Sequence, residues 1–217
     1  MPDPVIFPNA YFPPIYWWSL ALHHKNFLIE NRETYPKQTY RNRCYIYSAN
    51  GPMQLNIPVR KTMGNHTPIS EIEIDHTKNW KLVHWRSIES SYSKTPYFLF
   101  YKDIFSRYFD YDHQFLHEYT FSIIQTCIVA LKAKSIEPSF TTEYIKDPND
   151  LREMLNPKIA PRQLGFRTFP RYIQPFEERH GFIENLSILD LLFNLGPDAQ
   201  NYLEMLYKVN FNELNVT

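Results

Sequence analysis

The chain has 217 residues, of which 43% are hydrophobic and 17% aromatic, so a single globular domain with a large core is expected over residues 1–217. Its 23 basic and 23 acidic residues balance, which removes the broad positive field that favours binding to nucleic acid or an anionic membrane. The two cysteines, Cys44 and Cys127, form no Cys-x-x-Cys pair. This pattern argues against structural zinc and a disulfide framework, and it suits a reducing cytoplasm.

The N-terminal residues alternate between strand and helix patterns. Residues 5–7 indicate a buried strand, Pro13-Pro14 precedes apolar residues at helical spacing, and 27–30 has the pattern of a second strand. The apolar run at 15–22 is too short to span a membrane and follows no basic segment of the signal-peptide kind. We therefore expect a cytoplasmic α/β protein with a central, largely parallel sheet flanked by helices.

The middle of the chain contains a hairpin signal. Two β-rich runs, 44–47 and 53–58, flank Asn50-Gly51, which is a strong signal for a tight turn. They predict a β-hairpin. A further short strand is expected at 71–74, where polar and apolar residues alternate.

The rest of the chain is mainly helical in pattern. Apolar residues at helical spacing indicate amphipathic helices, and the pair Gly196-Pro197 marks a helix end. In chain order we expect a helix from 79, a helix after Pro96, a long helix at 112–134, a strand at 139–145, a helix at 186–195 and a short helix through Tyr207.

Residues 146–171 have no helical or strand periodicity. Prolines and arginines are scattered through them. A long irregular segment in a compact domain is often functional, for example as a lid over a substrate. A plain surface loop is the alternative.

Several common site motifs are missing from the sequence. Gly-x-Gly-x-x-Gly, the P-loop, Gly-x-Ser-x-Gly and His-Glu-x-x-His do not occur, and there are only five glycines. Common phosphate cradles, the α/β-hydrolase site and the zinc-peptidase site are therefore disfavoured. No metal site is expected.

Residues 37–43 hold the densest group of candidate binding side chains: Gln38, Arg41, Asn42 and Arg43. Guanidinium groups bind phosphates and carboxylates through two parallel hydrogen bonds, and amides fix orientation. The segment therefore predicts a site for an anionic substrate, with a solvated strand entry as the alternative. In a strand, Arg41 and Arg43 are expected on one face and Asn42 on the other.

His84 is the candidate general acid or base. It recurs with Trp80, Ile88 and Tyr92 every four residues, so these side chains form one stripe of a helix. A partly buried imidazole on this stripe can transfer protons near neutral pH. A packed core histidine is the alternative for His84, and aromatic packing is the alternative for Tyr92.

Asp190 is the second candidate catalytic residue, because it lies inside the apolar segment 186–193. A buried carboxylate is costly unless it has a partner, so Asp190 could orient a histidine or an arginine. The alternative is a capping box, because Ser187 and Asp190 have the Ser-x-x-acid spacing of a helix start.

Together these segments resemble the WbqC-like protein family, in its Bacteroidetes-type form. Tyr11, Trp80 and Tyr92 lie in matching segments, and we assign them to substrate binding with the residues of 37–43. The matching segments are Tyr11-Phe12-x-Pro14-Ile15, Lys37-Gln38-Thr39-Tyr40-Arg41-Asn42-Arg43, Asn79-Trp80-x-x-x-His84-Trp85, Tyr92-x-x-x-Pro96-Tyr97-Phe98 and the run from His180 to Asn194.

The resemblance implies a transferase of O-antigen or other surface-polysaccharide biosynthesis. It implies transfer of an aminoacyl group such as glycine, or of a similar group, to a sugar, with a nucleotide-sugar or other small-molecule substrate. Many family members begin with His-Gln-Pro-x-Tyr-Leu-Pro, but Phe7 and Pro8 stand here at the first two positions. His84 is then the candidate for the role of the missing histidine.

The order of the first elements is also similar to that of enzymes that adenylate carboxylates on a parallel sheet, so a nucleotide such as ATP is a candidate cofactor. A non-catalytic ligand-binding protein or an adapter of the same pathway is the alternative function. Catalysis predicts a concave pocket that joins 37–43 to His84, whereas an adapter predicts a flat apolar patch.

Overall fold

A computed structural model describes residues 5–145, 151–152 and 155–211. Its central sheet has three parallel strands in the order β1 (Val5–Pro8), β2 (Phe27–Glu30) and β7 (Ser139–Phe140). Helix α1 (Ile15–His24) connects β1 to β2. The predicted α/β class and parallel sheet are confirmed.

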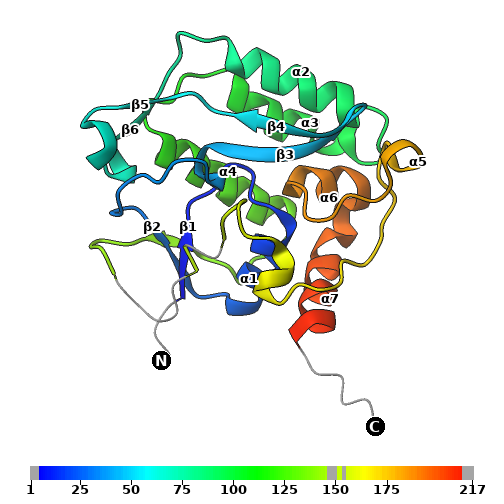
Figure 1. The fold of residues 1–217 in the computed structure, drawn as a ribbon. Coiled ribbons are helices and arrows are strands. Elements are labelled where there is room, and N and C mark those ends of the chain that lie inside the picture. The colour runs from blue at the N-terminus through cyan, green and yellow to red at the C-terminus, as the bar shows by residue number, and fades with distance from the viewer. Residues whose placement is uncertain (1–4, 146–150, 153–154, 212–217) are drawn as a thin grey trace.

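Two antiparallel pairs accompany the parallel sheet. β3 (Arg43–Ser48) and β4 (Gly51–Asn56) form the predicted hairpin. β5 (Val59–Lys61) pairs with β6 (Ile72–Ile74). In Figure 1, β5 and β6 lie beside the start of the β3–β4 hairpin, and the short helix α5 (Glu177–His180) lies beside its far end.

The remaining helices cover this framework. Helix α1 packs against α7, and α6 lies between α3 and β3. None of the helices in the described residues has the length and hydropathy needed to cross a membrane. The helices that have not yet been named are α2 (Trp80–Tyr92), α3 (Phe98–Ser106), α4 (Leu116–Ala130), α6 (Ile188–Leu195) and α7 (Ala199–Phe211).

Several predicted boundaries differ from the structure. β4 covers Gly51–Asn56 instead of 53–58, and α6 begins at Ile188 instead of residue 186. α4 is shorter than the predicted 112–134, because Phe115 is extended and bridges to Glu73, and Lys132 has a left-handed φ of 58°. β7 ends at Phe140 instead of residue 145, although the Thr141 amide still donates to the Ile29 carbonyl of β2 at 3.0 Å. α7 continues past Tyr207 to Phe211.

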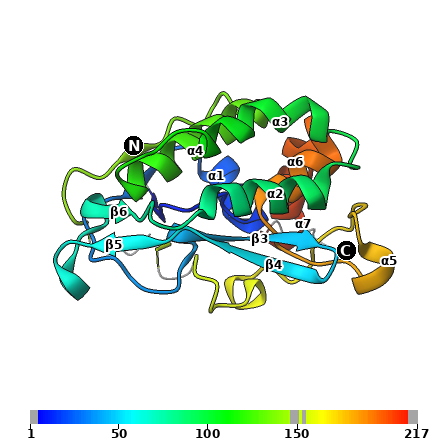
Figure 2. The same cartoon turned by 90° about the horizontal axis from the view of Figure 1, so that it is seen from above.

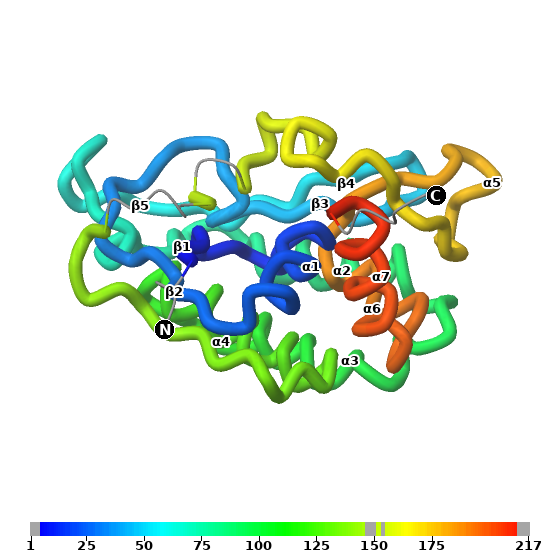
Figure 3. The backbone as a smooth tube through the Cα atoms, turned by 90° about the horizontal axis from the view of Figure 1, so that it is seen from below, coloured from blue at the N-terminus to red at the C-terminus, as the bar shows by residue number. Residues whose placement is uncertain are grey.

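The described part of 146–171 is packed onto the molecule. Leu155, Phe166 and Phe169 are buried in the core, and Pro161–Leu164 forms a 3-10 turn. Figures 2 and 3 both place the segment after Leu155 on the side of the β3–β4 hairpin that faces away from α4. Residues 146–150 and 153–154 of the predicted lid lie outside the described residues.

Candidate functional site

The carboxyl ends of the three parallel strands bring buried polar side chains together. Asn9 follows β1, Glu30 ends β2 and Thr141 follows β7, and all three are buried. The Thr141 hydroxyl donates to Glu30 Oε1 at 3.1 Å and accepts from the Asn31 amide at 3.1 Å. Ligands of open parallel sheets bind beyond this edge, so we call Asn9, Glu30, Asn31 and Thr141 the sheet edge.

Arg41 lies beside the sheet edge in a buried ion pair with Glu33. Its backbone is part of a 3-10 turn at Tyr40–Asn42, capped by the Thr39 hydroxyl. The predicted strand alternation of Arg41 and Asn42 is therefore wrong, because β3 begins only at Arg43. Burial raises the pKa of the Glu33 carboxyl, although the Arg41 guanidinium opposes the shift.

A second buried ion pair joins the sheet edge to the segment after β7. Arg152 Nη1 donates to Glu30 Oε2 at 2.8 Å, and its Nη2 donates to the Ile145 carbonyl at 2.7 Å. Each of these two carboxylates is therefore paired with a buried arginine, Glu33 with Arg41 and Glu30 with Arg152. Glu30, Glu33 and Arg152 are additions to the predicted site residues, and an acidic residue at the end of a predicted strand could have marked Glu30.

Three cationic side chains, Lys61, Arg41 and Arg43, act on Tyr35, and a fourth, Lys37, lies near Lys61. We call Tyr35, Lys37, Arg41, Arg43 and Lys61 the Tyr35 cluster. Lys61 Nζ lies 5.1 Å from the ring centroid. Burial raises the pKa of the Tyr35 hydroxyl to about 12, while the charges of Arg41 and Arg43 act to lower it. Lys61 is partly desolvated and also lies near the charge of Lys37, and both effects lower its pKa. The local potential is therefore positive although the whole chain is neutral.

Several buried polar atoms at this place have no protein partner among the described residues. They are Asn31 Oδ1, Arg41 Nε, Asn42 Oδ1, Arg43 Nε and His117 Nδ1. Folded proteins satisfy nearly all buried polar groups with protein atoms, water or a ligand. The unpaired atoms include the donors Arg41 Nε and Arg43 Nε and the acceptors Asn31 Oδ1 and Asn42 Oδ1. A polar anionic molecule can form hydrogen bonds with both kinds of atom.

Gln38 stands at the exposed edge of the same segment. Its backbone has a left-handed φ of 60°, which costs roughly 1 kcal/mol or more for a residue other than glycine. Such strain often accompanies functional loops. The structure thus brings Gln38, Arg41, Asn42 and Arg43 into one region.

His84, Tyr11 and Trp80 form a different, buried group. His84 is only 3% exposed, and its Nδ1 lies 3.0 Å from the Tyr11 hydroxyl. Burial lowers the pKa of His84 to about 4, against the effect of a hydrogen bond with the Asn56 backbone. The Tyr11 amide donates to the Tyr40 carbonyl at 2.9 Å. His84 therefore supports the turn before Arg43, and its proton-transfer role stays a prediction.

Asp190 and Tyr92 lie in a third group. Tyr172 and Gln174 both donate to Asp190 Oδ2, the latter at 3.0 Å, so the carboxylate has neutral donors instead of a histidine or an arginine. Burial raises the pKa of Asp190 to about 6. Ser187 caps α6 through the Leu189 amide, but the Ser187 amide donates to Tyr45, so the reciprocal half of a capping box is not formed.

Comparison with known proteins confirms the family resemblance seen in the sequence. The model of the WbqC-like protein family matches residues 9–156, which include the sheet edge and the Tyr35 cluster but not Asp190. Over 221 aligned residues the chain is 25% identical to uncharacterized protein Rv1507c of Mycobacterium tuberculosis, with 90% of this chain and 94% of that protein covered. No solved structure matches the chain.

Proposed function

Because the chain belongs to the WbqC-like protein family, we propose that it is a cytoplasmic transferase of surface-polysaccharide biosynthesis. In this proposal it moves an aminoacyl group such as glycine, or a similar group, from an activated anionic donor to a sugar. The family resemblance supports the pathway. The relative is itself uncharacterized and adds no activity.

The observation that carries the proposal is the Tyr35 cluster beside the sheet edge. Lys37, Arg43 and Lys61 have no carboxylate partner in the ion pairs of the described residues. Arg43 Nε is buried and has no hydrogen-bond partner among the described residues. A positive site with an open guanidinium favours a phosphate or carboxylate group, and the phosphates of a nucleotide sugar or of ATP fit this chemistry.

The proposal gives the predicted residues distinct roles. Arg43 contacts the anion directly. Arg41 forms an ion pair with Glu33 and contributes positive charge beside the anion. The amides of Gln38 and Asn42 orient the ligand. His84 is neutral at pH 7 and fixes Tyr11 and the turn at Tyr40–Asn42, and proton transfer by His84 requires that it reach the substrate.

A non-catalytic binding protein of the same pathway is the second candidate function. It is favoured by the burial of His84, which is 3% exposed and bonded to Tyr11. A binding protein needs the Tyr35 cluster alone, whereas a transferase also needs a group that moves a proton. Both candidate functions predict that the same ligand binds, but only the transferase converts it into a product.

We expect Arg43→Lys to weaken binding of ATP or UDP-glucose by roughly 10- to 100-fold, because lysine keeps the charge but loses the planar fork, and a charged hydrogen bond contributes about 1.5–3 kcal/mol. Thermal-shift titration measures this, since a ligand of the folded state raises the melting temperature. Arg60→Lys is the matched control, because Arg60 is exposed and pairs with Glu73 on the β5–β6 pair.

Equal affinity of wild type and Arg43→Lys for every ligand that binds would contradict the anion site, as would the absence of binding by both probes. Mass spectrometry then separates the two functions. With ATP, glycine and a sugar present, a transferase that activates glycine yields the glycyl sugar, AMP and pyrophosphate, whereas a binding protein leaves ATP, glycine and the sugar unchanged.

A further inference from the structure

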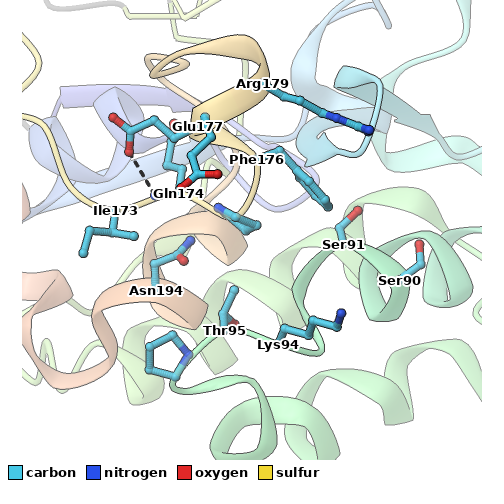
Figure 4. A pocket seen from close by; sticks show the side chains of 13 residues that line it. Ser90, Ser91, Lys94, Thr95, Ile173, Gln174, Phe176, Glu177, Arg179 and Asn194 are labelled. Carbon is cyan, nitrogen blue, oxygen red and sulfur yellow. Dashed lines mark hydrogen bonds between the residues drawn. The ribbon is translucent and has the colours of Figure 1, made fainter.

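A separate cavity of about 800 Å³ lies at the far end of the β3–β4 hairpin. Three segments distant in sequence line it: residues 90–96 at the end of α2, residues 173–179 before and within α5, and Asn194 on α6. Figure 4 shows their side chains around the opening. Its size lies in the range of about 300–1,000 Å³ that is typical of sites for small organic molecules, and a single amino acid would leave most of it empty.

The cavity differs from the Tyr35 cluster in charge. Two cations, Lys94 and Arg179, and two carboxylates, Glu177 and Glu178, line it. Glu177 is already paired with Arg171 and accepts from the Gln174 amide. With Arg171 counted, three cations and two carboxylates lie here, so this wall is much less positive than the Tyr35 cluster, and its neutral polar groups decide the kind of ligand.

The other lining groups are hydroxyls and amides. Ser90, Ser91 and Thr95 supply hydroxyls, and Gln174 and Asn194 supply amides. The Ser90 and Thr95 hydroxyls donate to backbone carbonyls and so offer acceptors to a ligand, whereas Asn194 keeps one N–H and its carbonyl oxygen. These groups match a ligand whose own groups donate and accept hydrogen bonds. The hydroxyls of a saccharide have this property.

An aromatic ring completes the wall. Phe176 is half-buried, and its ring centroid lies 5.7 Å from that of Tyr47, whose hydroxyl donates to the Phe176 carbonyl at 3.0 Å. A ring held in this way can cover the apolar C–H face of a sugar, while the polar residues reach its hydroxyls. Aromatic and hydroxyl or amide groups therefore occur together in the same cavity.

The polar wall is fixed before any ligand arrives. Gln174 donates to Asp190 at 3.0 Å and to the Ile183 carbonyl at 3.0 Å, and its oxygen accepts from the Ile183 amide at 2.8 Å. Asn194 donates to the Asp190 carbonyl at 2.7 Å, and the Thr95 hydroxyl donates to the Tyr92 carbonyl at 2.8 Å. Side chains that are already ordered lose little entropy on binding.

We propose that this cavity is a binding site for a neutral saccharide. It is separated from the Tyr35 cluster by the length of β3, which spans roughly 17 Å at about 3.4 Å per residue. Saccharide binding stands on the cavity alone. A role as the acceptor site rests on the proposed function.

Saturation-transfer NMR with maltose, cellobiose, lactose and N,N′-diacetylchitobiose at millimolar concentration tests the site. We expect at least one sugar to bind the wild type and Ser90→Trp to weaken that binding at least tenfold, because the exposed Ser90 can carry a large ring into the cavity without disturbing the core. Leu82→Trp is the matched control, since Leu82 is exposed on the same helix but does not line the cavity.

Three outcomes overturn the proposal: no sugar binds, binding is equal in wild type and Ser90→Trp, or Leu82→Trp weakens it as much. Inorganic pyrophosphate serves as the charged probe. The proposal is also overturned if Ser90→Trp weakens the binding of pyrophosphate more than it weakens the binding of any sugar. Failure of the anion site is seen separately, because Arg43→Lys is expected to leave sugar binding unchanged.

Discussion

Asp190 and Glu30 are both fully buried carboxylates, but their partners differ. Glu30 pairs with Arg152 at 2.8 Å. Among the described residues, the Asp190 carboxylate is hydrogen-bonded by three neutral side chains, those of Tyr172, Gln174 and Tyr92. Without a cation to offset desolvation, burial raises the pKa of Asp190 to about 6, so the ionised form at pH 7 costs stability.

We expect Asp190→Asn to raise the free energy of unfolding at pH 7 by roughly 1–3 kcal/mol, because each unit of pKa shift corresponds to about 1.4 kcal/mol. The asparagine oxygen keeps the bonds from Tyr172 and Gln174, and the charge is gone. Urea unfolding measures the change. Asp103→Asn, an exposed residue of α3, is the control and should change stability by less than about 0.5 kcal/mol. Lower stability of Asp190→Asn would show that the charge itself is needed.

At the scale of elements, the ion pair of Arg152 with Glu30 joins the segment after β7 to the sheet edge. Arg152 is 4% exposed and Glu30 0% exposed, and the Leu151 amide donates to the Ile6 carbonyl at 2.9 Å. A buried pair that loses one partner leaves an uncompensated charge, which costs about 3–5 kcal/mol. Arg152 therefore helps to hold the described part of 146–171, together with the buried Leu155, Phe166 and Phe169.

We expect Arg152→Met to speed tryptic cleavage after Lys158 and Arg162 by roughly 10- to 100-fold, because local opening exposes these bonds more often. Mass spectrometry of native digests measures the rates relative to cleavage after Lys132 in the same sample. Arg60→Met, which breaks an exposed pair, is the control and should change little. Equal rates in Arg152→Met and wild type would contradict the anchoring role. Protection by ATP would support the lid predicted for 146–171.

The sequence predicts the elements better than the contacts between them. The strand expected at 27–30 coincides with β2, and the stripe of Trp80, His84, Ile88 and Tyr92 is buried on α2, because both depend on local periodicity. The ion pair of Arg41 with Glu33 and the third group around Asp190 depend on tertiary packing. The cavity joins residues more than 75 positions apart, so no local pattern marks it.

At the scale of the whole molecule, two buried titratable groups act on stability in opposite directions. Burial raises the pKa of Asp190 from 3.8 to about 6 and lowers that of His84 from 6.5 to about 4. Between these values the folded state holds the Asp190 proton more tightly than the unfolded state, so this contribution to stability falls as pH rises. The folded state holds the His84 proton less tightly, so that contribution rises with pH.

We therefore expect the two contributions, each about 3 kcal/mol at most, to cancel largely between pH 4 and 6 in the wild type. In a variant that lacks one of the two groups, the pH dependence caused by the other is no longer cancelled. His84→Gln should lose stability as pH rises through this window, and Asp190→Asn should gain it. The double variant is the reference, because subtracting its urea-unfolding profile removes the contributions of all other groups, including His117 and His113, whose pKa values burial also lowers. Slopes of the same sign in the two difference profiles would contradict the opposed titration, and a flat His84→Gln difference would mean that Asp190 is ionised in the folded core throughout this range.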